Sequence, residues 1–197
     1  RDLEIICLLH DIGRSGMDPQ FFGRIFGLAQ ERGLPVRLKG LRSRYPAVSE
    51  AEAPAFFLDL IRPALAEADT ADADLLMDHV RMRMDFKGRL REVLGARASE
   101  LAELGVTIHP WMEKVMLYYY YPQDMEGEPE DVRLMAMTLV ACENFEAYNN
   151  WRRGRDYYAR SKERLRDVFD ALERFREEGI VADRVLTALR LLTASRS

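Results

Sequence analysis

A histidine and an aspartate stand side by side at the end of the first apolar run of the sequence. His10 and Asp11 follow the apolar residues of segment 3–9, and Gly13 comes two residues later. An imidazole nitrogen and a carboxylate oxygen are both ligands for divalent ions, and adjacent residues can reach one ion. Gly13 lets the backbone turn away from such a site. The pair predicts a metal site or, in a structural role, a carboxylate that fixes the imidazole tautomer.

Two other histidines and a run of tyrosines are further candidates for chemistry. His79 lies in an apolar stretch, whereas His109 precedes Pro110. A residue before proline favours extended backbone, which is typical of a helix start, so we expect a structural role for His109. The tyrosines at 118–121 fall within a predicted helix, where successive side chains point about 100° apart. They cannot all be buried, so one or two should face a cleft or a partner.

Two segments resemble the metal-dependent phosphohydrolases of the HD-domain superfamily, particularly the HD-GYP branch that hydrolyses cyclic di-GMP. Segment 8–14, Leu-Leu-His-Asp-Ile-Gly-Arg, is similar to the family motif Leu-Leu-His-Asp-Ile-Gly-Lys. Segment 139–150, Leu-Val-Ala-Cys-Glu-Asn-Phe-Glu-Ala-Tyr-Asn-Asn, resembles the helix with the last metal ligand. The arginines that follow resemble an Arg-x-Tyr-Arg turn, and segment 178–192 resembles the end of the family's domain.

The resemblance implies a set of site residues. The implied ligands of a divalent ion (manganese, iron or magnesium) are His10, Asp11, His79 and Glu143, and Asp11 would be the catalytic residue of an active enzyme. The implied lining of the ligand cleft comprises Arg14, Tyr118, Tyr119, Tyr120, Tyr121, Arg152 and Arg153.

The middle of the chain departs from the family pattern. Counting back from segment 126–129, the family's paired histidines fall within the tyrosine run, and phenols with pKa near 10 are poor ligands at neutral pH. The family's Gly-Tyr-Pro loop is absent from the sequence. The long spacing from His10 to His79 implies an insertion at about 34–70. We expect the tyrosines to fill the former metal cleft, to stack on a nucleotide base, or to pack in the core with their hydroxyls at its rim.

The resemblance therefore predicts a degenerate HD-GYP-like domain. Such a domain is a regulatory, ligand-binding or interaction module in bacterial signalling, with a cyclic dinucleotide or protein partner and a sensory or receiver domain before it. The alternative is an active phosphohydrolase with a reduced, mononuclear site. The loss of two imidazoles weighs against catalysis.

The elements that must position these residues are helices. Apolar residues recur every three or four positions without an alternating run, which predicts an all-α, HD-like bundle of eight or nine helices in one domain over 1–197. Residues 34–48 hold proline, glycine and several basic residues, which favours a surface loop. Capping residues precede three of the helices: Asp18 with Pro19, Ser49 with Glu52, and Thr70 with Asp72. The predicted helices span 2–10, 19–33, 49–68, 70–87, 89–104, 110–121, 130–151, 156–178 and 182–194.

Composition narrows the functional classes. The chain has 197 residues with 29 Lys and Arg against 33 Asp and Glu, a net charge of −4, which argues against general nucleic-acid binding. No apolar run approaches the roughly 20 residues of a membrane span. Cys7 and Cys142 lie in apolar runs, which favours reduced, buried thiols in a cytoplasmic protein. Because the sequence opens with Arg1, we expect it to be the C-terminal part of a larger protein.

Overall fold

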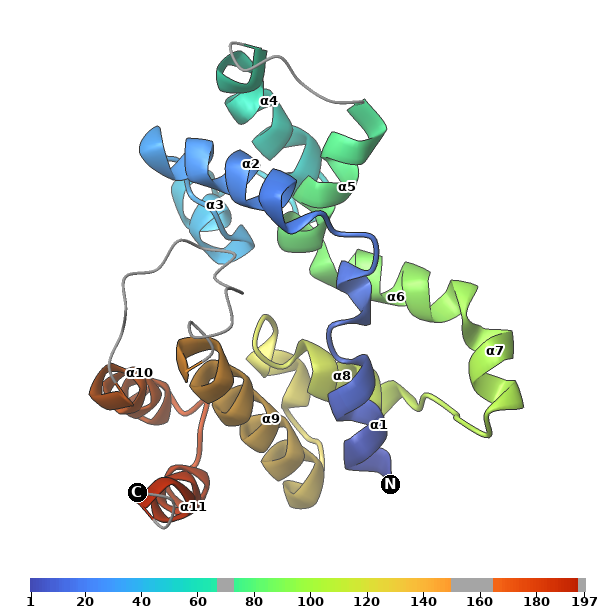
Figure 1. The fold of residues 1–197 in the computed structure, drawn as a ribbon, viewed down its shortest axis with the longest axis vertical. Coiled ribbons are helices and arrows are strands. Elements are labelled where there is room, and N and C mark those ends of the chain that lie inside the picture. The colour runs from blue at the N-terminus through green and yellow to red at the C-terminus, as the bar shows by residue number, and fades with distance from the viewer. Residues whose placement is uncertain (67–72, 150–164, 195–197) are drawn as a thin grey trace. The chain divides into compact units, whose positions relative to one another are not determined.

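A computed structural model describes residues 1–66, 73–149 and 165–194. This part of the chain is helical throughout and contains no strand, so the predicted all-α class is confirmed (Figure 1). The elements are α1 (Asp2–Leu9), η1 (Ile12–Arg14), α2 (Pro19–Glu31), α3 (Leu38–Arg44), α4 (Ala53–Ala66), α5 (Ala73–Met84), α6 (Phe86–Ala96), α7 (Ala98–Glu103), α8 (Pro110–Leu117), η2 (Pro122–Met125), α9 (Glu130–Asn149), α10 (Leu165–Glu177) and α11 (Asp183–Ala194), where η marks a 3₁₀-helix.

The helices form two compact units, where the sequence predicted one domain. The first unit combines residues 1–10 with the described residues from Leu101 onward, and the second comprises the described residues from Asp11 to Glu100. The division falls at the peptide bond between His10 and Asp11. The two neighbouring candidate ligands therefore belong to different units.

In the second unit, α2, α4 and α5 pack against one another around an apolar core. Helix α2 begins where the sequence predicted, because the Asp18 carboxylate accepts hydrogen bonds from the backbone N–H groups of Gln20 (2.9 Å) and Phe21 (3.2 Å). Phe26 stacks on Phe57 of α4 with ring centroids 5.4 Å apart. The fully buried residues of this core are Ile25, Ala29, Leu41, Ala53, Phe57, Ile61, Val80 and Met84.

The predicted capping box before α4 is confirmed. Ser49 Oγ accepts from the Glu52 N–H at 3.3 Å, and the Glu52 carboxylate accepts from the Ser49 N–H at 3.1 Å. Pro63 lies inside α4, which continues to Ala66. The Thr70 and Asp72 cap predicted for the next helix lies outside the described residues.

The basic segment 34–48 contains a helix, α3, where the sequence predicted a loop. Leu41 is fully buried, while Lys39 and Arg42 are exposed. Seven residues make only two helical turns, so a single buried leucine cannot reveal a periodic pattern. The predicted loop was wrong for this reason. A break near Arg97 likewise divides the predicted helix 89–104 into α6 and α7.

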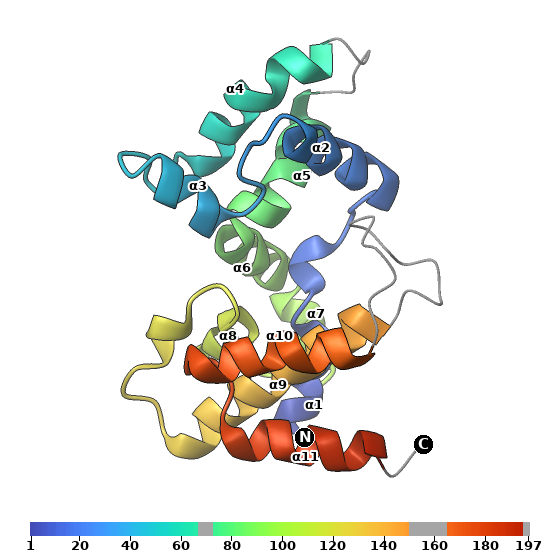
Figure 2. The same cartoon turned by 90° about the vertical axis from the view of Figure 1, so that its left-hand side faces the viewer.

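In the first unit, α9 packs against α8, α10 and α11, and α1 packs against α8. Helices α10 and α11 form an antiparallel pair joined by a short turn (Figure 2). Although six of the eight residues of α1 are apolar, only Ile6 is buried in it, and Leu8 is 81% exposed. None of the helices described in either unit is both long and apolar enough to cross a membrane.

Candidate metal site around His10

The His10–Asp11 pair stands at the end of α1, just before a tightly packed 3₁₀ turn. In that turn Gly13 lies against α6, and a Cβ atom added to it would come within 2.9 Å of a Phe86 ring carbon and 3.2 Å of the Leu90 backbone. The sequence predicted that Gly13 lets the chain turn away. The φ angle of Gly13 is not positive, however. The residue of this turn with left-handed backbone is Gly16, whose φ is 81°. Gly13 is instead required for close packing.

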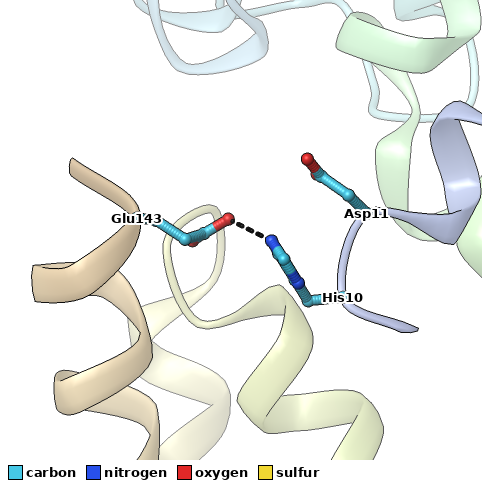
Figure 3. Close-up of side chains that lie close together, drawn as sticks. All are labelled: His10, Asp11 and Glu143. Atoms are coloured by element: carbon cyan, nitrogen blue, oxygen red, sulfur yellow. Dashed lines mark ion pairs between the residues drawn. The ribbon is translucent and has the colours of Figure 1, made fainter. Parts of the chain in front are cut away.

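The predicted proximity of His10 and Glu143 is confirmed. The His10 Nε2 atom lies 3.0 Å from Glu143 Oε1, across the contact between the end of α1 and the middle of α9 (Figure 3). Both residues belong to the first unit. Their side chains are 22% and 32% exposed, so solvent reaches the pair.

The hydrogen bonds of the His10 ring show which of its nitrogen atoms carries a proton. His10 Nδ1 lies 2.8 Å from the Cys7 carbonyl oxygen, which can only accept, so Nδ1 carries a proton. An ionised Glu143 carboxylate is also only an acceptor. The 3.0 Å contact at Nε2 therefore needs a proton on that nitrogen or a cation shared by both atoms.

This donor set fits a divalent ion. Two ligand atoms that each lie about 2.1 Å from an ion, at right angles, are about 3.0 Å apart, which matches the separation of His10 Nε2 and Glu143 Oε1. The Cys7 carbonyl orients the imidazole through its second nitrogen, as carbonyls do for metal-bound histidines. Metal binding itself stays a prediction.

Asp11, the next residue along the chain, is a predicted ligand that belongs to the second unit. Asp11 Oδ1 lies 2.9 Å from Arg14 Nε. Arg14, predicted to line a ligand cleft, is thus paired with Asp11, and its guanidinium lies 5.8 Å from the centroid of the Phe86 ring.

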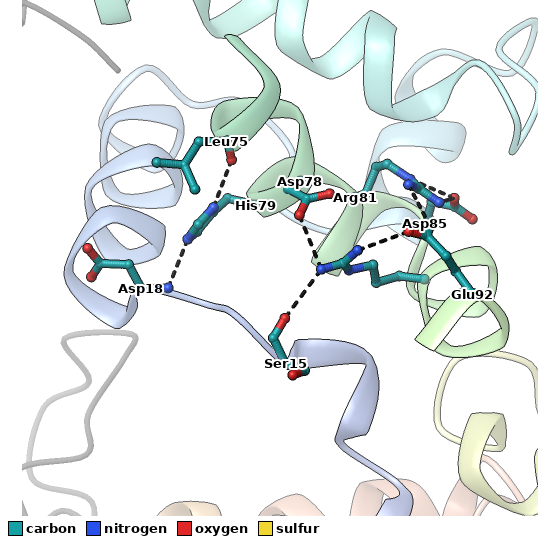
Figure 4. Close-up of polar contacts among 9 residues, drawn as sticks. Ser15, Asp18, Leu75, Asp78, His79, Arg81, Asp85 and Glu92 are labelled. Carbon is teal, nitrogen blue, oxygen red and sulfur yellow. Dashed lines mark hydrogen bonds and ion pairs between the residues drawn. The ribbon is translucent and has the colours of Figure 1, made fainter. Parts of the chain in front are cut away.

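His79, the fourth predicted ligand, is not part of this group. It is fully buried in the second unit, where its Nε2 atom accepts the Asp18 backbone N–H at 2.9 Å (Figure 4). Its Nδ1 atom lies 2.8 Å from the Leu75 carbonyl oxygen, and the Phe21 ring contacts it edge-on at 4.9 Å. Both ring nitrogens are therefore engaged by backbone groups, which ties α5 to the start of α2.

A network of charges beside His79 was not predicted from the sequence. The Arg89 guanidinium contacts the Asp78 carboxylate at 3.1 Å, the Glu92 carboxylate at 3.3 Å and the Ser15 carbonyl at 3.3 Å. Arg81 lies 2.9 Å from the same Glu92 carboxylate (Figure 4). These contacts join α5, α6 and the segment before α2. Arg81 also lies 3.4 Å from the Asp85 carboxylate, so the network joins two guanidinium groups to three carboxylates.

The tyrosine run lies at the end of α8 rather than inside it. Helix α8 ends at Leu117, so the predicted helix to 121 was too long. Tyr118 and Tyr121 are 4% and 6% exposed, and the Tyr118 hydroxyl donates to the Ile180 carbonyl at 3.0 Å. The Tyr119 ring packs edge-on against Phe175. Two of the four rings are thus buried, and Tyr119 and Tyr120 are half-buried.

The remaining candidates are His109, Arg152 and Arg153. His109 is the N-cap of α8 with extended backbone, as Pro110 predicted. Arg152 and Arg153 lie outside the described residues.

Both cysteines are exposed, contrary to the predicted buried thiols. Apolar neighbours in sequence did not indicate burial, because α1 turns only Ile6 fully inward.

Comparisons of the chain with protein-family models, with curated proteins and with solved structures give no match. The likeness to HD-GYP domains is therefore carried by the motif residues alone.

Proposed function

We propose that this chain is a degenerate HD-GYP-like regulatory module of a bacterial cytoplasmic signalling protein, which holds one divalent metal ion at His10 and Glu143. The contact between His10 Nε2 and Glu143 Oε1, at 3.0 Å, carries this proposal. It joins the two segments that resemble the family motifs.

The residues around the pair support a preorganised site. The Cys7 carbonyl fixes the His10 ring so that Nε2 faces Glu143. Residues that orient metal ligands in this way raise the affinity of a site. An imidazole and a carboxylate suit manganese, iron or magnesium better than softer ions.

The small number of side chains that can bind metal supports a regulatory role rather than catalysis. The chain has three histidines, of which His79 is engaged by backbone groups and His109 begins a helix. A bound divalent ion would lower the pKa of a water molecule and polarise a phosphoryl oxygen. Two charged centres usually stabilise the attacking and leaving oxygens of such a displacement, whereas these residues offer ligands for one ion. The module therefore binds a cyclic dinucleotide or a protein partner without hydrolysis.

Calorimetric titration of the chelator-treated chain with Mn²⁺ tests the metal site. We expect one site per chain, and we expect His10→Ala and Glu143→Gln each to weaken binding about tenfold or more. Glu146→Gln is the matched control, because Glu146 is an exposed glutamate one turn further along α9 and lies outside the ligand group. Wild-type protein that binds no Mn²⁺, or equal loss in the control, would overturn the metal site.

A hydrolysis assay separates the module from the enzyme. Cyclic di-GMP incubated with the chain and Mn²⁺ should give no linear dinucleotide above the protein-free blank. A metal-dependent rate that His10→Ala and Asp11→Ala abolish, but Glu146→Gln retains, would replace the regulatory proposal with a mononuclear phosphohydrolase.

A further inference from the structure

Two thiols flank the His10–Glu143 contact within the first unit. Cys7 lies on α1 and Cys142 on α9, and they are the only two cysteines in the sequence. Both residues are exposed, so a small oxidant in solution reaches them.

The contacts of the neighbouring residues bring the two cysteines together. The Cys7 carbonyl accepts from the His10 ring at 2.8 Å, so Cys7 lies one turn back on the side of α1 that carries this ring. The same ring touches Glu143 at 3.0 Å, and Cys142 is the residue before Glu143. The contact between His10 and Glu143 therefore brings the helical turns that carry the two cysteines close together.

The electrostatics agree with this placement. Partial burial raises the pKa of the Cys142 thiol, and the nearby Cys7 raises it further. The Glu143 carboxylate raises the pKa of both thiols. Each sulfur thus lies within electrostatic range of the same carboxylate, and Cys142 within range of Cys7.

We propose that Cys7 and Cys142 form an intrachain disulfide when the protein meets a hydroperoxide. One thiolate attacks the peroxide O–O bond, which breaks to give a sulfenic acid and an alcohol, or water from hydrogen peroxide. The second thiolate then attacks the sulfenic sulfur and expels hydroxide, which takes up a proton as water. Two thiols lose two electrons and two protons in total, and the peroxide takes up both.

The crosslink would hold the end of α1 against α9. It would close a loop of more than one hundred residues, and long loops give the largest entropic stabilisation in the chain-entropy account. This inference does not rest on metal binding, so the oxidation is carried out with a chelator present.

The experiment uses the reduced full chain at micromolar concentration with excess hydrogen peroxide, followed by alkylation and mass spectrometry. We expect a monomer about 2 Da lighter than the reduced protein, with no alkylatable thiol. Peptide mapping without reductant should identify the Cys7–Cys142 link. The melting temperature should rise by about 5 °C or more and return to its starting value with dithiothreitol.

The variants Cys7→Ser and Cys142→Ser are controls that cannot form the intrachain disulfide. Each retains one thiol and can form only sulfenic, sulfinic or sulfonic acids or an intermolecular dimer. Wild-type protein that gives these same products in the same yields, without the crosslinked peptide, would overturn the proposal. Serine is close in size to cysteine and both positions are exposed, so the variants should fold.

Discussion

Replacing His79 by leucine tests whether this histidine has a structural role or binds a metal ion. The His79 ring is fully buried, and it accepts the Asp18 N–H at the first turn of α2. Leucine has a similar volume but no acceptor, so the variant leaves that N–H without its partner. If the role of His79 is structural, the substitution destabilises the second unit and leaves metal binding at His10 unchanged.

The size of the effect follows from the two hydrogen bonds. A buried donor left without an acceptor costs about 1–3 kcal/mol. The second bond, from Nδ1 to the Leu75 carbonyl, adds less, because that carbonyl lies four residues back and is a regular helix acceptor. We expect His79→Leu to lower the free energy of unfolding by about 1–3 kcal/mol. His79→Ala also opens a cavity and should cost about 3–5 kcal/mol.

Urea denaturation followed by circular dichroism measures this change, and Mn²⁺ titration of the same preparations measures metal affinity. Gln30→Leu is the control, because Gln30 is exposed on α2 of the same unit and its substitution should stay within about 0.5 kcal/mol of wild type. A His79→Leu protein as stable as this control would refute the structural role. Folded His79→Leu protein with tenfold weaker Mn²⁺ binding would show that the histidine is a ligand.

Three further predictions concern single contacts. Gly13→Ala places a methyl group about 3 Å from a ring and a backbone of α6, so urea denaturation should show a loss of about 1–3 kcal/mol; a loss below about 0.5 kcal/mol would contradict the close packing. Tyr118→Phe removes a hydrogen bond to the turn between α10 and α11 and should cost about 1 kcal/mol in the same assay, whereas unchanged stability would mean that the bond contributes nothing. Although both cysteines are exposed residues, partial burial of their thiols raises the pKa of each. Because only thiolates react readily, iodoacetamide should alkylate the folded chain more slowly than free cysteine at the same pH, with an inflection at higher pH; an inflection at lower pH than that of free cysteine would contradict the raised pKa.

Much of the helical architecture could be predicted because local signals determine it. The Asp18 cap, the Ser49–Glu52 capping box and the Pro110 helix start each depend on a few adjacent residues, and each is confirmed. Helix α3 was not predicted, because Leu41 is its single buried residue and one residue cannot show a helical period. The division of the chain into two units depends on contacts between distant residues, which no local pattern records.

The candidate site was predictable only in part. The proximity of His10 and Glu143 followed from two motif-like segments that resemble halves of one site. The engagement of His79 could not be read from its neighbours, because an apolar stretch gives the same pattern around a ligand and around a core histidine. Gly13 was interpreted as a flexible turn, since a sequence does not reveal which helix a glycine must approach.

The order of the two units along the chain affects when each can fold during synthesis. Helix α1 leaves the ribosome well before its packing partner α8, which begins only at Pro110. Ribosomes add about 5–20 residues per second, so α1 waits on the order of 5–20 s for that partner. The segment from Asp11 to Glu100 emerges in the meantime and holds the core residues of the second unit. Ile6, the residue of α1 that is buried in the folded protein, therefore stays uncovered until the later helices of the first unit have been made.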